Sequence, residues 1–140
     1  MQVRRVVLGL TGVLTLALCA SAGAQAEKES AKAAAEPVVK QLEAFRRDDY
    51  DTAYTFASEE IRQRFDRRGF EDMVRDGYPE IARSASASVV GTELRPDGLA
   101  YVTIKIRGAN GQSVEALYEM IWQGAWRINA VVTRPDRDTI

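Results

Sequence analysis

Three aspartates and two tyrosines lie together in the stretch DDYDTAY, which begins at residue 48. A carboxylate base and a tyrosine hydroxyl in an apolar pocket can move a proton beside a ketone, as in ketosteroid isomerase. The candidate bases and donors for such an isomerase or dehydratase are Asp48, Asp49, Asp51, Tyr50, Tyr54 and Tyr118. The same aspartates also lie at an expected helix start, where the helix dipole favours acidic residues. No acid is placed within an apolar face, so we favour a non-catalytic function.

A second group of side chains could line a small apolar cavity with a few polar groups, as is typical of ligand sites. Its members are Tyr50, Tyr54, Tyr78, Tyr118, Trp122, Trp126, Arg127 and Asn129. The alternative is that the aromatics only fill a core, because apolar residues recur at helical spacing from Tyr50 to Ala57. Arg127 either pairs with an acid such as Glu119 or reaches a ligand. The sequence leaves these alternatives open.

Several classes of chemistry are missing from the chain. It contains no histidine, which is the commonest general base and the commonest metal ligand. No zinc motif, P-loop or dinucleotide fingerprint is present. The DDYD stretch lacks the later glycine and glutamate of an EF-hand loop. We therefore expect no metal site and no cofactor.

The N-terminus has the order of a secretory signal peptide. Residues 1–5 carry two arginines, residues 6–18 carry no charge, and small residues follow. The uncharged run is too short to span a bilayer comfortably, although an uncleaved anchor helix is the alternative. Cleavage near Ala24 or Ala26 would remove the only cysteine, Cys19, together with two of the 19 basic residues.

Cleavage defines what the mature protein should be. With 20 acidic residues retained, its net charge becomes −3, which gives no reason to expect nucleic-acid binding. We expect an exported, periplasmic protein without a disulfide and without a stable membrane anchor. The expected division is a signal peptide over residues 1–24, a flexible polar tether over 25–35 and a single domain over 36–140.

Helical patterns come first in the domain and strand patterns follow. Val38, Leu42 and Phe45 form one helical stripe, with Pro37 expected at the first turn of that helix. From residue 84 onwards the period changes to two, which predicts strands over residues 84–94, 100–107, 114–122 and 126–132. The fold class is therefore α+β, with N-terminal helices packed on a curved antiparallel sheet of about four strands.

The register of the middle hairpin can be predicted. A three-residue loop with Gly111 in the left-handed region pairs Gly108 with Gln112. The pairs that follow are Ile104 with Ala116, Val102 with Tyr118, and Lys105 with Glu115. This register aligns the apolar faces of both strands and also pairs opposite charges.

Both faces of the last two strands carry apolar residues. Leu117, Ile121 and Val131 are expected on one face, and Tyr118, Met120 and Trp122 on the other. One face can meet the helices, and the open face needs cover from the rest of the sheet or from a second subunit. We therefore expect a homodimer through the open sheet face.

Three stretches of the chain suggest a family. LEAFRRDDYDTAYTFAS, FEDMVRDGYP and LYEMIWQGAWRINAVV resemble the DUF4864 family, from about Val38 to Val132. The chain departs from the family pattern at Ala130, where a glycine is expected after the W-R-I strand. The resemblance implies an NTF2-like cone, a curved sheet wrapped around helices with a cavity in its mouth. It implies no activity, because NTF2-like domains include isomerases, dehydratases and many non-enzymes.

These observations together predict an exported, non-catalytic NTF2-like domain. It would bind a partner or a small apolar ligand and would form a homodimer. An isomerase-like or dehydratase-like enzyme with an Asp/Tyr pair in the cavity of the cone is the alternative hypothesis.

Overall fold

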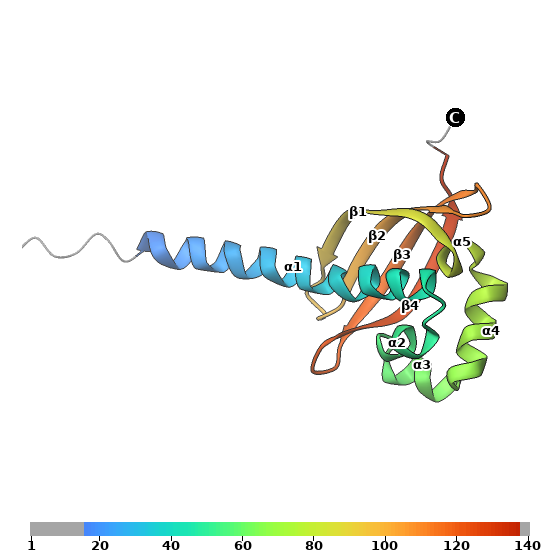
Figure 1. The fold of residues 1–140 in the computed structure, drawn as a ribbon. Coiled ribbons are helices and arrows are strands. Elements are labelled where there is room, and N and C mark those ends of the chain that lie inside the picture. The colour runs from blue at the N-terminus through green and yellow to red at the C-terminus, as the bar shows by residue number, and fades with distance from the viewer. Residues whose placement is uncertain (1–15, 138–140) are drawn as a thin grey trace, which may run out of the picture.

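The computed structural model describes residues 16–137, with side chains for residues 29–137. Within that range helices come first and strands follow (Figure 1). The helices are α1 (Leu16–Arg46), α2 (Tyr50–Thr55), α3 (Glu59–Arg64), α4 (Arg67–Gly77) and α5 (Pro79–Ala82). The strands are β1 (Ser84–Leu94), β2 (Ala100–Gly108), β3 (Ser113–Trp122) and β4 (Trp126–Pro135).

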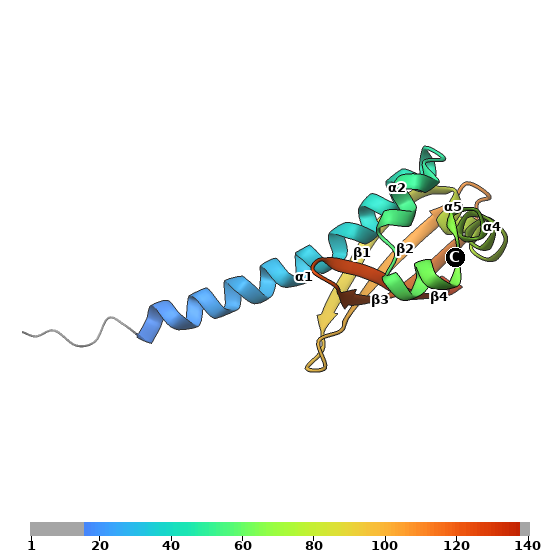
Figure 2. The same cartoon turned by 90° about the horizontal axis from the view of Figure 1, so that it is seen from below.

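The four strands form one open antiparallel sheet in the order β1-β2-β3-β4. Helix α1 runs across one face of the sheet, and α4 and α5 close one end of it (Figures 1 and 2). The predicted fold class is therefore confirmed: α+β, with N-terminal helices packed on a four-stranded antiparallel sheet. This arrangement is consistent with the NTF2-like fold.

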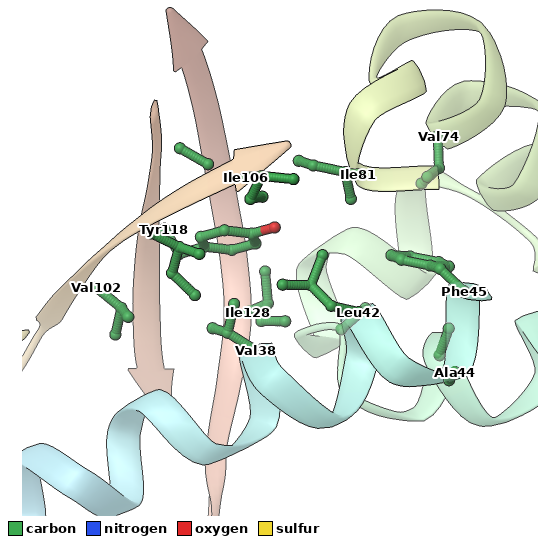
Figure 3. Packing of buried hydrophobic residues seen from close by; sticks show 14 of the residues in the cluster. Val38, Leu42, Ala44, Phe45, Val74, Ile81, Val102, Ile106, Tyr118 and Ile128 are labelled. Carbon is green, nitrogen blue, oxygen red and sulfur yellow. The ribbon is translucent and has the colours of Figure 1, made fainter. Parts of the chain in front are cut away.

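The core lies between α1 and the inner face of the sheet. Alternate residues of β2 and β3, such as Ile104 and Tyr118, are buried, and the residues between them are partly or fully exposed. The α1 stripe of Val38, Leu42 and Phe45 faces them (Figure 3). Burial of each large apolar side chain contributes about 1.5–3 kcal/mol, so this contact fixes how the helix lies on the sheet.

The predicted register of the β2–β3 hairpin is confirmed. Gly111 has a φ of 81°, and the Gly108 amide donates to the Gln112 carbonyl oxygen at 2.8 Å. The three predicted cross-strand pairs form, including Lys105 opposite Glu115. A glycine in the left-handed region closes this loop without the strain that a side chain would add there.

Strand β4 contains a bulge at Asn129, which changes the predicted faces of its side chains. Met120 pairs with Ile128 but Glu119 pairs with Ala130, so Asn129 is the extra residue. Beyond the bulge the strand is shifted by one residue, which reverses the faces of its side chains. The prediction that Val131 shares a face with Leu117 is therefore wrong. Leu117 pairs instead with Val132.

Helix α1 begins earlier than the domain was expected to begin. Residues 25–35 are helical, and Ala34 and Ala35 belong to the buried core. These two alanines therefore contribute to the core, although they lie in the segment expected to be a tether. Pro37 lies inside the helix and not in its first turn. A proline removes one helical hydrogen bond, and burial of Ala34 and Val38 on either side of it supports the continuous helix.

Side chains cap the starts of the two short helices α2 and α3. Asp49 caps α2 by accepting a hydrogen bond from the Thr52 amide at 3.1 Å. This bond holds the pKa of Asp49 below its ordinary value. Ser58 caps α3 through the Ile61 amide at 3.2 Å. Such caps satisfy amides that the first helical turn leaves without partners.

Most of the predicted signal peptide falls on residues 1–15, which lie outside the described residues. Over the part of the chain that the structure describes, no helix has both the length and the apolar character required to cross a membrane. The export prediction is not tested by either observation.

Candidate functional site

A cavity of about 300 Å³ lies between the helices and the inner face of β3 and β4. Its wall is mostly aliphatic and aromatic, with contributions from α1, α3, α4, α5 and β4. The apolar residues that line it include Phe45, Ile61, Phe65, Phe70, Met73, Val74, Ile81, Ile128 and Val131. A volume of this size is at the lower end of ordinary ligand sites.

The cavity has a buried floor and an exposed rim. Phe45, Gln41 and Tyr118 at its floor are buried. Arg64 and Ala130 are exposed lining residues, so the opening lies between the end of α3 and strand β4. A small molecule could therefore enter from solvent and reach the inner face of the sheet.

Tyr118 is a buried polar residue in the wall of the cavity. The residue is 1% exposed, and its hydroxyl, which points from β3 toward the helices (Figure 3), has no hydrogen-bond partner within the described residues. Burial raises the pKa of this phenol well above its usual range, so it is neutral at ordinary pH. A neutral phenol can donate or accept one hydrogen bond, and burial without a partner is costly.

Three other polar side chains in the wall already have partners. Gln41 donates to the Ala53 carbonyl oxygen at 3.1 Å, and the Tyr78 hydroxyl donates weakly to the Val131 carbonyl oxygen at 3.4 Å. Asn129 accepts from the Ser58 hydroxyl at 2.8 Å and donates to Glu119 at 2.9 Å. These groups shape the cavity, whereas the Tyr118 hydroxyl and the exposed Arg64 side chain have no partner within the described residues.

The bulge of β4 explains how Asn129 reaches this position. The segment before α3 adds to the edge of β4, because the Ser58 amide donates to the Ile128 carbonyl oxygen at 2.8 Å and the Ile128 amide donates to Phe56 at 2.9 Å. Ser58 therefore lies beside the bulge, where its hydroxyl meets Asn129. One local irregularity fixes the start of α3 and one side of the cavity.

The eight predicted pocket residues separate into three groups. Tyr78, Tyr118 and Asn129 line the cavity. Trp122, Trp126 and Arg127 line a different, shallower groove against α1. Tyr50 and Tyr54 are among the lining residues of neither.

The two tyrosines outside the cavity have structural roles. Tyr50 is fully buried in the core. The Tyr54 hydroxyl donates to the Phe65 carbonyl oxygen at 2.6 Å and lies 3.1 Å from that of Arg62. Tyr54 thereby anchors the C-terminal end of α3, which carries the rim residue Arg64.

The tryptophan groove lies at the tip of the β3–β4 hairpin. The rings of Trp122 and Trp126 meet edge to face with centroids 5.5 Å apart, and Trp122 is 60% exposed. Arg127 donates to the Thr55 carbonyl oxygen at 2.6 Å. Of its two predicted roles, a pair with Glu119 does not form, because Glu119 bonds to Asn129 and Tyr101.

The candidate catalytic aspartates lie away from the cavity. Asp48 pairs with Arg75 at 3.3 Å and with Arg83 at 3.2 Å. Asp49 caps α2 and Asp51 pairs with Arg67 at 2.6 Å. Among the described residues that line the cavity, none is an aspartate or a glutamate. The arrangement therefore places no carboxylate base in the wall that contains Tyr118.

The described residues also hold no cluster of three or more side chains suited to a metal ion. Gln41 and Arg64 are two polar lining residues that the sequence did not suggest as pocket candidates. Gln41 lies three residues after Val38 on the same helical stripe, so helical periodicity could have found it. Arg64 lies three residues after Ile61 on α3, and only the position of β4 opposite makes it a rim residue.

Comparison with known proteins gives one match. The model of the DUF4864 family, described as a domain of unknown function, matches residues 27–140. No curated protein and no solved structure matches the chain.

Proposed function

Because the chain belongs to the DUF4864 family, which carries no assigned function, we propose a function from its own cavity. The domain binds a small, largely apolar molecule that carries one polar group. The observation that supports this most directly is an apolar cavity with Tyr118 among its lining residues, since the hydroxyl of Tyr118 lacks a partner among the described residues. A ligand oxygen would satisfy it.

The volume sets the size of the ligand. An apolar cavity of roughly 150 Å³ accommodates benzene, so a cavity of about 300 Å³ suits a molecule of roughly ten to twelve non-hydrogen atoms. The apolar wall supplies affinity through burial, and the phenol supplies orientation. The proposal is binding and not catalysis, since no described acidic residue lines this cavity.

Native mass spectrometry of the gently purified protein, with and without added 1-octanol, tests the proposal. We expect a retained or added small molecule on the wild type. Tyr118→Phe should weaken octanol binding about tenfold, because it removes one hydrogen bond from a dry site. Met73→Trp should block binding, because it places a large ring in the cavity wall.

Tyr50→Phe is the matched control for Tyr118→Phe. Tyr50 also has a buried hydroxyl without a partner in the described chain, but it does not line the cavity. Its variant should bind octanol like the wild type. Absence of any bound molecule on the wild type, together with no octanol binding, would contradict the proposed function.

We also propose that the domain is exported. The support is the signal-peptide order of residues 1–24. N-terminal sequencing of the protein recovered from a periplasmic fraction tests this. A new N-terminus near residue 25 or 27 is expected, and an intact residue 1 on cytoplasmic material would contradict it.

We still propose a homodimer through the outer face of the sheet. Because of the bulge in β4, this face carries Val132 in place of Val131. Leu117 and Val132 form an exposed cross-strand pair on the outer face of the sheet, 39% and 63% exposed. The ion pair of Glu115 with Arg134 gives this face one charge of each sign, which a twofold interface can match. Val132→Glu should convert a dimer to a monomer in native mass spectra, and Val90→Glu on exposed β1 should not.

A further inference from the structure

Arg64 gives the rim of the cavity a positive charge. It is the one charged side chain among the described residues that line the cavity. The guanidinium is exposed and has no hydrogen-bond or ion-pair partner within residues 29–137. Nearby arginines are engaged differently: Arg67 and Arg75 both pair with Glu71.

The position of Arg64 is set by the fold. The Tyr54 hydroxyl bonds to the Phe65 carbonyl oxygen at 2.6 Å, which holds the end of α3 against α2. Phe65 also packs against the core. The backbone on which Arg64 is carried is thus anchored at the cavity opening, while its long side chain remains available.

We propose that the ligand of this cavity is an amphipathic monocarboxylate, with its carboxylate on Arg64 at the rim, its apolar body against the wall, and a further polar group, such as a hydroxyl, at the inner end beside Tyr118. This assignment rests on the proposed function of the cavity. A planar guanidinium matches a carboxylate through two parallel hydrogen bonds. A phosphate would call for more positive charge than one arginine, and the lining residues supply no other cation.

The polarity of the wall agrees with this class of ligand. The floor and sides of the cavity are apolar, with aromatic and aliphatic groups such as Phe70 and Ile81. The charge occurs only at the solvent-exposed rim, where a carboxylate can stay partly hydrated and avoid the desolvation of a buried ion. A neutral molecule would make the same apolar contacts with the wall but would form no ion pair with Arg64.

Octanoate and 1-octanol are matched probes for the test, since both have an eight-carbon chain and differ at the polar end. We would titrate each into the purified protein by isothermal titration calorimetry. The wild type should bind octanoate at least tenfold more tightly than octanol. Raising the salt concentration should weaken octanoate binding and leave octanol binding nearly unchanged.

Variants of α3 then show whether octanoate binds specifically to Arg64 or is attracted by the positive charge of the helix in general. Arg64→Ala should lose the preference for octanoate and keep the octanol affinity, and Arg64→Lys should keep part of the preference. Arg62→Ala is the control, because Arg62 is an exposed arginine of the same helix that does not line the cavity. It should bind both probes like the wild type.

Each outcome has a distinct meaning. Equal affinity of the wild type for both probes, or equal losses in Arg62→Ala and Arg64→Ala, would overturn the carboxylate assignment and leave ligand binding itself supported. Binding of neither probe, to wild type or variants, would overturn the assignment together with the proposed function.

Discussion

The structure contains two buried tyrosines that differ in what surrounds their hydroxyl groups. Tyr50 at the α1–α2 joint and Tyr118 on β3 are each 1% exposed. Both hydroxyls lack a partner among the described residues, and burial raises the pKa of both phenols. Tyr118 is among the residues that line the cavity, whereas Tyr50 is not.

The contacts of the Tyr50 ring account for its burial. It lies 5.2 Å from the Phe45 ring, and the guanidinium of Arg75 lies 4.6 Å from its centroid. Aromatic and cation–π contacts of this kind each contribute about 0.5–1.5 kcal/mol. They offset part of the cost of a buried hydroxyl without a hydrogen bond, which is about 1–3 kcal/mol.

Tyr118 has no cation over its ring within the described residues. No cation–π contact therefore offsets the free-energy cost of burying its hydroxyl without a hydrogen bond. Burial and a missing hydrogen-bond partner therefore do not by themselves identify a binding residue. The adjoining cavity is what distinguishes Tyr118 from Tyr50.

The largest expected effect is at Phe45, which joins the two regions. Its ring packs on Tyr50, lies 6.1 Å from Phe70, and lines the cavity. Phe45→Ala should lower the free energy of unfolding by about 3–5 kcal/mol, because it removes a buried ring and leaves a void. Urea denaturation measures this.

The control for Phe45→Ala is Val89→Ala, since Val89 is 44% exposed and should change the stability by no more than about 0.5 kcal/mol. A loss below about 1 kcal/mol in Phe45→Ala would mean that the two regions are not joined by one packed core.

The local features of this fold were predictable from sequence. The hairpin at Gly111 and the caps at Asp49 and Ser58 depend on residues within a few positions of one another. The Asn129 bulge was not predictable, because its side chain bonds to Ser58, which is 71 residues away in the sequence, as well as to Glu119 on the neighbouring strand. The burial of Ala34 likewise depends on the sheet that covers it.

The candidate site was predictable in part for the same reason. Strand alternation puts Tyr118 on the same face as Met120, and in the structure Tyr118 is among the residues that line the cavity. Trp122 and Trp126 also fitted an aromatic pattern, yet they lie at a hairpin tip. Residue type alone does not show whether an aromatic side chain lines the cavity or the tryptophan groove, because aromatic rings line both. Which one forms depends on how far along the strand the helices extend.

Alkaline pH should distinguish the two tyrosines from exposed ones. A raised pKa in the folded state contributes stability that is complete below the ordinary value of 10.0 and is lost as the pH rises above it. The loss for one fully shifted tyrosine is about 1.4 kcal/mol per pH unit. Urea unfolding between pH 9 and 11 should show a smaller decline in Tyr118→Phe than in the wild type. Equal declines would contradict the burial of that phenol.

At neutral pH, Tyr50→Phe and Tyr118→Phe should each stabilise the ligand-free protein by about 1 kcal/mol, because each removes a buried hydroxyl without a partner. The two variants should then separate in the presence of octanol, which stabilises only proteins that bind it. Thermal unfolding with and without octanol measures both effects. Loss of stability in Tyr118→Phe without ligand would indicate that its hydroxyl is already satisfied.

The smallest expected effect is the coupling between Arg75 and the Tyr50 ring. Arg75 also pairs with Glu71 and Asp48 at 3.3 Å, so a single substitution would mix these contributions. A double-mutant cycle of Arg75→Gln with Tyr50→Leu isolates the ring contact, which should be about 0.5–1 kcal/mol. The same cycle with Tyr118→Leu should give a coupling near zero, because no described cation lies over that ring. Equal couplings would show that the two tyrosines share one environment, and the distinction between a packed ring and a ligand-facing one would then be lost.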